Sequence, residues 1–308
     1  MATLLIEDPV FLTHHVPQGH PERPARIEAV SAVLGGDRFD GLMRSNAPEA
    51  ALDRILLAHD GRYIEEIQKA LPESGIVQIE ADSYLSPESY AVALRAAGAA
   101  CRAVDEVIEG RASNAFVAAR PPGHHAERDR PMGFCLFNNA AIAARHAQER
   151  HGVARVAIID WDVHHGNGTQ AIFWNDPSVL YASTHQMPLY PGTGAISETG
   201  AGNIFNAPLH EGDEGEAFRA AMTERIFPAV EQFSPDLIII SAGFYAHWRD
   251  PLAGLNLKAE DFASVTKAVM DIADRRCGGR IVSLLEGGYD LTGLRESVAA
   301  HVSTLMAA

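Results

Sequence analysis

Two aspartates and two histidines follow an apolar run near the middle of the chain. The run opens the segment RVAIIDWDVHHGNG, residues 155–168, and is rich in Ile and Val, which predicts a strand buried on both faces. Side chains two apart along a strand share a face, so we expect Asp160, Asp162 and His164 to point one way and His165 the other. Carboxylates beside a buried strand are costly unless a cation or hydrogen-bond donors compensate them. An Asp and a His at this spacing are suitable ligands for a zinc-type ion; the alternative is a solvated polar loop.

A pair of adjacent histidines, His124 and His125, follows a second apolar run. The run AFVAA, residues 115–119, predicts a buried strand, and the segment RPPGHHA, residues 120–126, follows it directly. Proline and glycine do not continue a strand comfortably, so a rigid loop is expected at the carboxyl end of this strand. We interpret the two histidines as catalytic, and a purely structural role is the alternative.

Together these residue types permit metal-assisted amide hydrolysis. A metal held by Asp162 and His164 could polarise a carbonyl and lower the pKa of a bound water. A nearby histidine could take the proton of that water and pass it to a leaving amine, while Asp160 orients a histidine. Tyr289, on the glycine-flanked loop EGGY, could donate a hydrogen bond to the developing oxyanion or simply cap the core.

The elements that must position these residues alternate along the chain. Apolar runs predict strands at 115–119, from 155, at 179–183, 237–242 and 280–285, and periodic segments predict helices at 90–108, 139–150, 214–233, 259–274 and 291–306. Such alternation predicts an α/β fold in which helices cover both faces of a parallel sheet. Ligands bind at the carboxyl ends of the strands in such folds. The two His/Asp clusters, Ser183, Tyr245 and Tyr289 all follow predicted strands, so we expect one active site. Residues 186–206, rich in Gly, Pro and Thr, are expected to form a long functional loop.

Composition limits the classes of protein and partner. The chain has 308 residues, a net charge of −15 and 47% hydrophobic residues, and we expect a single domain spanning residues 1–308. The acidic balance argues against a nucleic-acid partner. The three cysteines of the chain are odd in number and widely spaced. This pattern indicates that the protein has no disulfide framework and is found in a reducing compartment. Neither a signal peptide nor a membrane-spanning run is evident, so a cytoplasmic location is predicted.

From about residue 15 to the terminal helix, the sequence resembles the zinc-dependent histone deacetylases and their bacterial, class II-like amidohydrolase relatives. The motifs occur in the order expected of that family: RPPGHHA, GFCLFNNAAIAA, DWDVHHGNGTQ, YPGTG, SAGF-x-AH-x-x-DPL and LEGGY. The resemblance implies a single-domain arginase-like fold, and hydrolysis of the acyl amide of an acylated lysine peptide or a small amide.

The resemblance also implies a role for each matching residue. Asp162 and His164 would be zinc ligands, His125 the general base and acid, and Tyr289 the group that polarises the acyl carbonyl. The supporting residues of the two histidines would be Asp160, paired with His124, and Asn167, paired with His125. The substrate tunnel would be lined by Gly133, Phe134, Tyr190 and Leu252, with Asp82 gripping the substrate backbone at the rim. Potassium ions would bind near Asp160, Asp162, His164 and Ser183, and again near Phe173 and Val179.

One position departs from the family pattern. The family motif SAGFDAH reads SAGFYAH in this chain, so Tyr245 stands where the third zinc ligand is normally an aspartate. A catalytic zinc usually has three protein ligands and an open position. We favour impaired metal binding with weak or absent activity. The alternatives are that Tyr245 binds zinc as a phenolate, which its ordinary pKa near 10 disfavours, or that another side chain such as His247 replaces the missing ligand.

Three functions are compatible with the sequence. The first is a zinc amidohydrolase that releases acyl groups from lysine side chains or related amines. The second is a catalytically inactive deacetylase-fold module that binds acylated ligands, which Tyr245 favours and the intact His125 and Tyr289 disfavour. The third, a two-metal ureohydrolase of the arginase type, is disfavoured because LIIISA, residues 237–242, is not followed by a second carboxylate-rich motif. Leu252, where an acidic residue would favour acetylpolyamines, favours acyl-lysine peptides or small neutral amides.

Overall fold

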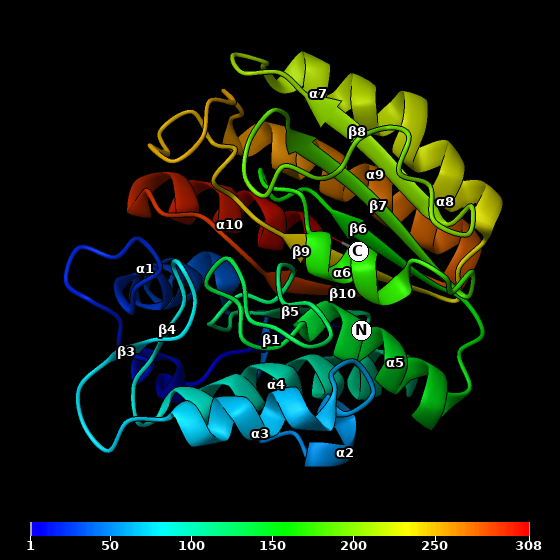
Figure 1. Cartoon of the computed structure of the whole chain (residues 1–308). Coiled ribbons are helices and arrows are strands. Elements are labelled where there is room, and N and C mark those ends of the chain that lie inside the picture. The colour runs from blue at the N-terminus through cyan, green and yellow to red at the C-terminus, as the bar shows by residue number, and fades with distance from the viewer. Residues whose placement is uncertain (1, 308) are drawn as a thin grey trace.

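A parallel sheet runs through the centre of the molecule (Figure 1). The computed structural model describes residues 2–307. Within them, eight strands pair in the order β2-β1-β5-β10-β9-β6-β7-β8, and every pairing between neighbours in this sheet is parallel. A separate two-stranded antiparallel sheet is formed by β3 and β4.

The described strands are β1 (Thr3–Ile6), β2 (Met43–Ser45), β3 (Val77–Gln78), β4 (Tyr84–Leu85), β5 (Asn114–Val117), β6 (Val156–Asp160), β7 (Val179–Gln186), β8 (Ile204–Leu209), β9 (Leu237–Ala242) and β10 (Ile281–Leu285). The described α-helices are α1 (Ala25–Leu34), α2 (Leu52–Ile55), α3 (Gly61–Ala70), α4 (Ser89–Ile108), α5 (Asn139–His151), α6 (Asn167–Phe173), α7 (Gly215–Ala221), α8 (Phe227–Phe233), α9 (Ala259–Cys277) and α10 (Leu291–Met306). A π-helical segment, Met222–Ile226, joins α7 to α8.

The path of the chain places four loops side by side. After β5 the chain crosses to β6, continues outward through β7 and β8, and then returns to insert β9 and β10 between β6 and β5. Because the four central strands are parallel, their carboxyl ends meet at one edge of the sheet. The loops that follow β5, β10, β9 and β6 therefore converge there.

Helices cover both faces of the sheet, as Figure 1 shows. On one face α4 packs against β5 and β10, and α5 packs against β6 and β9; on the other, α9 and α10 pack on the central strands and α8 reaches β7. Helix α4 is rich in alanine, which favours helix formation and close packing. At Gly98 of α4 a Cβ would lie 2.0 Å from the carbonyl oxygen of Pro48, so only glycine fits there.

The predicted α/β fold with a parallel sheet and helices on both faces is confirmed. Three strands of the large sheet were not predicted: β1, β2 and β8. The expectation of a loop over residues 186–206 was wrong at both ends, because β7 continues to Gln186 and β8 begins at Ile204. Among residues 2–307, no helix combines the length and the apolar character that a membrane crossing needs.

Candidate active site

A cavity of about 280 Å³ opens where the four central loops meet. Its lining residues are Asp82, Pro122, His124, His125, Gly133, Phe134, His164, Tyr190, Tyr245, Leu252, Gly287 and Tyr289. All but Pro122 and Gly287 were predicted to belong to the site. The other predicted residues, Asp160, Asp162 and Asn167, lie behind this lining as hydrogen-bond partners. The structure thus brings the predicted set together, while their catalytic roles stay predictions.

Buried ion pairs and backbone hydrogen bonds hold the loop after β5 in place. The guanidinium of Arg120 donates to both carboxylate oxygens of Glu22, each at 2.7 Å. The backbone N–H groups of Gly123 and His124 donate to Oε2 of Glu286 at 2.7 and 3.2 Å. No role was predicted for Glu286. Its position directly after a buried strand was the available signal, since a carboxylate there needs donors.

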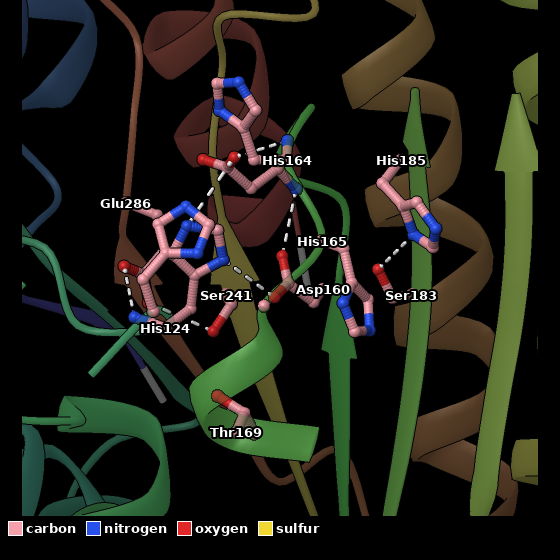
Figure 2. Close-up of polar contacts among 12 residues, drawn as sticks. His124, Asp160, His164, His165, Thr169, Ser183, His185, Ser241 and Glu286 are labelled. Carbon is pink, nitrogen blue, oxygen red and sulfur yellow. Dashed lines mark hydrogen bonds and ion pairs between the residues drawn. The ribbon is translucent and has the colours of Figure 1, made fainter. Parts of the chain in front are cut away.

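His124 forms a buried pair with Asp160 (Figure 2). Its Nδ1 lies 3.0 Å from Asp160 Oδ2, and its Nε2 lies 3.7 Å from Asp162 Oδ1. Burial alone would lower the pKa of His124, but the carboxylates of Asp162 and Asp160 outweigh it and raise the pKa to about 10. His124 is therefore a cation that compensates two buried carboxylates. Tyr181 adds a hydrogen bond from its hydroxyl to Asp160 Oδ2 at 3.0 Å.

His125 is held as a neutral imidazole. Its Nδ1 lies 2.8 Å from the side-chain oxygen of Asn167, whose amide nitrogen in turn donates to Glu127 at 2.8 Å. An amide oxygen only accepts, so Nδ1 of His125 carries the proton and Nε2 keeps its lone pair. Burial, followed by the charges of His124 and His164, holds the pKa of His125 well below 6.5. This arrangement suits a proton acceptor facing the cavity.

The loop after β6 turns away from the strand earlier than predicted. Strand β6 ends at Asp160, and Asp162 Oδ1 accepts a hydrogen bond from the backbone N–H of His164 at 2.9 Å, which bends the chain. The single face expected for Asp160, Asp162 and His164 therefore arises from a turn and not from strand alternation beyond residue 160. Asp162 Oδ2 also accepts from the backbone of Gly287 at 3.0 Å. His165 points away, toward Thr193 and Gln170.

Tyr245 fills the place expected for the third zinc ligand. Its side chain is only 3% exposed, and its hydroxyl contacts Nδ1 of His164. Burial, together with the Asp162 carboxylate, raises the pKa of Tyr245 well above 10, so the hydroxyl keeps its proton. The ring also requires Gly287, where a Cβ would lie 2.2 Å from Tyr245 Cε1.

These donors do not fit a catalytic zinc ion. A zinc site of this kind needs three imidazole, thiolate or carboxylate ligands. The expected ligand positions offer only the carboxylate of Asp162 and the imidazole of His164, and the phenol of Tyr245 contacts the Nδ1 atom of that imidazole. His247 does not supply the missing ligand, because its Nε2 lies 3.6 Å from Glu296 and it does not line the cavity. Its proposed rescue of the site was therefore wrong. The raised pKa keeps the phenol of Tyr245 protonated in the metal-free pocket, and its binding of zinc as a phenolate stays a prediction.

Aromatic rings shape the rest of the cavity. Phe134 packs edge-on to Tyr289 with ring centroids 5.8 Å apart, and Tyr190 packs edge-on to His125 at 5.2 Å. Burial raises the pKa of Tyr289 well above 10, so its hydroxyl is a hydrogen-bond donor. Tyr190 and Leu252 are 38% and 40% exposed and form the rim. This shape suits a narrow, mostly apolar chain with a polar end.

The two predicted potassium positions differ in the contacts around them. At the first position, Asp160 and Ser183 lie opposite each other in the register of β6 and β7. Potassium near these two residues stays a prediction. At the second position, the side-chain N–H₂ group of Asn203 donates to the carbonyl oxygens of Phe173 and Val179 at 2.9 and 2.8 Å. Those carbonyls accept hydrogen bonds from the chain itself, but each has a second lone pair, so potassium near them stays a prediction too.

The fold and site define an α/β protein with a paired-histidine pocket at the carboxyl edge of a parallel sheet. Comparison with known proteins gives the family: the histone deacetylase domain model matches residues 20–305. The histone deacetylase-like amidohydrolase of Pseudomonas aeruginosa is 42% identical over 88% of this chain and 73% of its own length. The chloroplastic histone deacetylase 14 of Arabidopsis thaliana is 41% identical over 95% and 74%. The crystal structure of the HDA15 HD domain superposes with a TM-score of 0.92 at 35% identity, covering 100% of this chain and 89% of that one. The chain belongs to the histone deacetylase family.

Proposed function

We propose that this chain is a deacetylase-type amidohydrolase for acylated lysine side chains or related small amides, in which Tyr245 impairs zinc binding and turnover. The observation that carries the proposal is the contrast within one pocket. The proton-transfer pair His125–Asn167 and the buried pair His124–Asp160 are in place, while the hydroxyl of Tyr245 contacts the imidazole nitrogen of His164.

The residues of the chain itself support acyl-amide binding and proton transfer. Nε2 of His125 is free to accept a proton and return it to a leaving amine. The Tyr289 hydroxyl can donate a hydrogen bond to an acyl carbonyl. Phe134 and Tyr190 line the cavity, where their rings could pack against the aliphatic side chain of an acyl-lysine. The proposal also includes a cytoplasmic location and potassium near Asp160, and zinc belongs to it as the ion whose binding Tyr245 weakens.

The test restores the missing carboxylate. With zinc added, Tyr245→Asp should hydrolyse an acetyl-lysine amide at least about tenfold faster than the parent chain, since even outer-shell changes at metal sites cost 10- to 100-fold. Tyr245→Phe, which removes only the hydroxyl, is the matched control and should stay as slow as the parent. Adding His125→Ala to Tyr245→Asp should abolish the gain. Equal turnover by the parent and Tyr245→Asp would contradict the impairment.

A second candidate is a binding module without turnover, and the cavity favours it. About 280 Å³ stays open beside the buried Tyr245 ring, so an acyl chain has room even where a metal does not fit. Calorimetric titration of the parent with an acetyl-lysine peptide should then show binding that Phe134→Ala weakens, with the peptide recovered intact. Absence of binding by the parent would exclude the module.

A further inference from the structure

A second group of metal-type ligands lies between α4 and α5. Asp105 comes from α4, and His146 and His151 come from α5. The Nε2 atoms of both histidines converge on the same carboxylate oxygen, Asp105 Oδ1, at 2.8 and 2.6 Å. One ligand atom from each residue lies within 4.8 Å of the other two, and this is the sole such trio of His, Cys, Asp or Glu among residues 2–307. None of the three lines the active-site cavity.

Two well-formed helices hold these ligands. Helix α5 starts at an Asn138 cap that accepts from the N–H of Ala141 at 2.9 Å, and it ends after His151 at Gly152, which adopts a left-handed φ of 65°. Helices α4 and α5 pack against each other beneath the sheet (Figure 1). The side chains of Asp105, His146 and His151 are 22%, 6% and 10% exposed. The cluster is thus rigid and largely shielded, but solvent reaches its carboxylate.

The donor set selects the class of ion. Two imidazoles and one carboxylate are typical of zinc and other late first-row divalent ions, and leave room for a water as fourth ligand. Calcium and magnesium need more oxygen ligands than the cluster provides. Arg150 competes for the same carboxylate, because its Nε lies 3.5 Å from Asp105 Oδ1. Its side chain is 58% exposed and can turn into solvent.

We propose that Asp105, His146 and His151 bind a zinc-type divalent cation that links α4 to α5. The ion would replace the two hydrogen bonds to Asp105 Oδ1 and stabilise the contact between the helices, because a ligand that binds only the folded state raises the melting temperature. The site is separate from the active-site pocket and does not depend on the proposed activity.

The test is zinc titration of the full chain by calorimetry, together with thermal unfolding with and without zinc. The parent should bind one equivalent at this site and show a rise in melting temperature. His151→Gln and Asp105→Asn should each weaken binding at least about tenfold and lose most of the rise. His210→Gln is the matched control, because His210 is an exposed histidine whose Nδ1 lies 3.8 Å from Asp213. His164→Gln removes the imidazole of the active site and should leave both readouts unchanged.

The outcomes separate this site from the catalytic one. Loss of zinc binding in His164→Gln, with retention in His151→Gln and Asp105→Asn, would place the ion in the pocket and overturn the proposal. Absence of zinc uptake by the parent would also overturn it. If Asp105→Asn changes the circular dichroism spectrum of the metal-free chain, His151→Gln decides, because its side chain lies at the end of α5.

Discussion

The ring of Tyr245 and the backbone of Gly287 fit each other at the centre of the pocket. A Cβ at Gly287 would lie 2.2 and 2.5 Å from Cε1 and Cδ1 of Tyr245, against 2.9 Å from Oδ2 of Asp162. The tightest restriction on this glycine therefore comes from the tyrosine. Because an aspartate has no ring at that place, the restriction should relax when residue 245 is shortened.

A double-mutant cycle tests this fit. Gly287→Ala should lower the free energy of unfolding of the parent by about 1–3 kcal/mol, the usual cost of overpacking a core. The same change should cost measurably less in Tyr245→Asp, which gives a coupling free energy between the two positions. Urea unfolding of the four chains measures it. Gly36→Ala, where a Cβ would meet only the Val33 carbonyl oxygen at 3.5 Å, is the control; equal costs in both backgrounds would contradict the argument.

Individual site residues could be predicted because their motifs are local. His124, His125, Asp162 and His164 each follow a strand in sequence, and parallel strands bring their carboxyl ends to one edge. The contact of Tyr245 with His164 could not be predicted, because the rotamer of a large ring depends on neighbours from other loops. The link from Glu286 to the backbone of residues 123–124 joins positions more than 160 residues apart.

At the scale of elements, the strands from β5 to β7 across the sheet were predicted, whereas the two edge strands and the neighbouring β1 were not. Strands β6 and β9 are continuous apolar runs because both of their faces are covered by helices. Strand β2 has only three residues, Met43–Ser45, and is half exposed. Strand β8, IFNAPL, contains Asn206 and Pro208; proline is tolerated there because β8 is at the edge of the sheet. The sequence of such a segment favours a loop, because its pairing with a neighbouring strand cannot be inferred from local residues.

The segment before α1 is joined to the loop after β5 by a fully buried ion-pair cluster. Glu22 accepts from Arg120 at 2.7 Å and from Arg26 at 3.1 Å. Burial alone would raise the pKa of Glu22, but the two guanidinium groups, Arg120 first, hold it well below its usual range. The carboxylate therefore stays charged, and its loss would leave two buried guanidinium groups with backbone carbonyls but without the carboxylate that compensates their charge.

Glu22→Gln should lower the free energy of unfolding by about 3–5 kcal/mol, the cost of removing one partner from a buried pair. Urea unfolding measures the loss. Glu28→Gln, on the exposed side of α1, is the matched control and should change stability by less than about 0.5 kcal/mol. A loss as small as that of the control would show that the cluster is dispensable for folding.

At the scale of the whole molecule, buried neutral histidines are spread well beyond the active site. Burial lowers the pKa of His14 and His59 to about 4 and that of His301 to about 3. His301, in α10, is buried in the core, where its ring nitrogens contact the hydroxyls of Thr266 at 2.6 Å and Ser283 at 2.8 Å. These hydroxyls satisfy the hydrogen bonding of the neutral imidazole, and burial disfavours its charged form.

The sign of the resulting pH dependence follows from proton uptake. Below about pH 6.5 the unfolded chain protonates His301, whereas the folded chain does so only near pH 3. The unfolded state thus binds more protons in this range, and stability falls as the pH falls, by about 1.4 kcal/mol per pH unit for each such histidine. His301→Gln, which keeps a donor and an acceptor, should make the slope of unfolding free energy against pH between 6 and 4 shallower by about that amount. Urea unfolding at a series of pH values measures the slope. His210→Gln, on the surface, should leave the slope as in the parent, and an unchanged slope in His301→Gln would mean that acid sensitivity arises from other groups in the core.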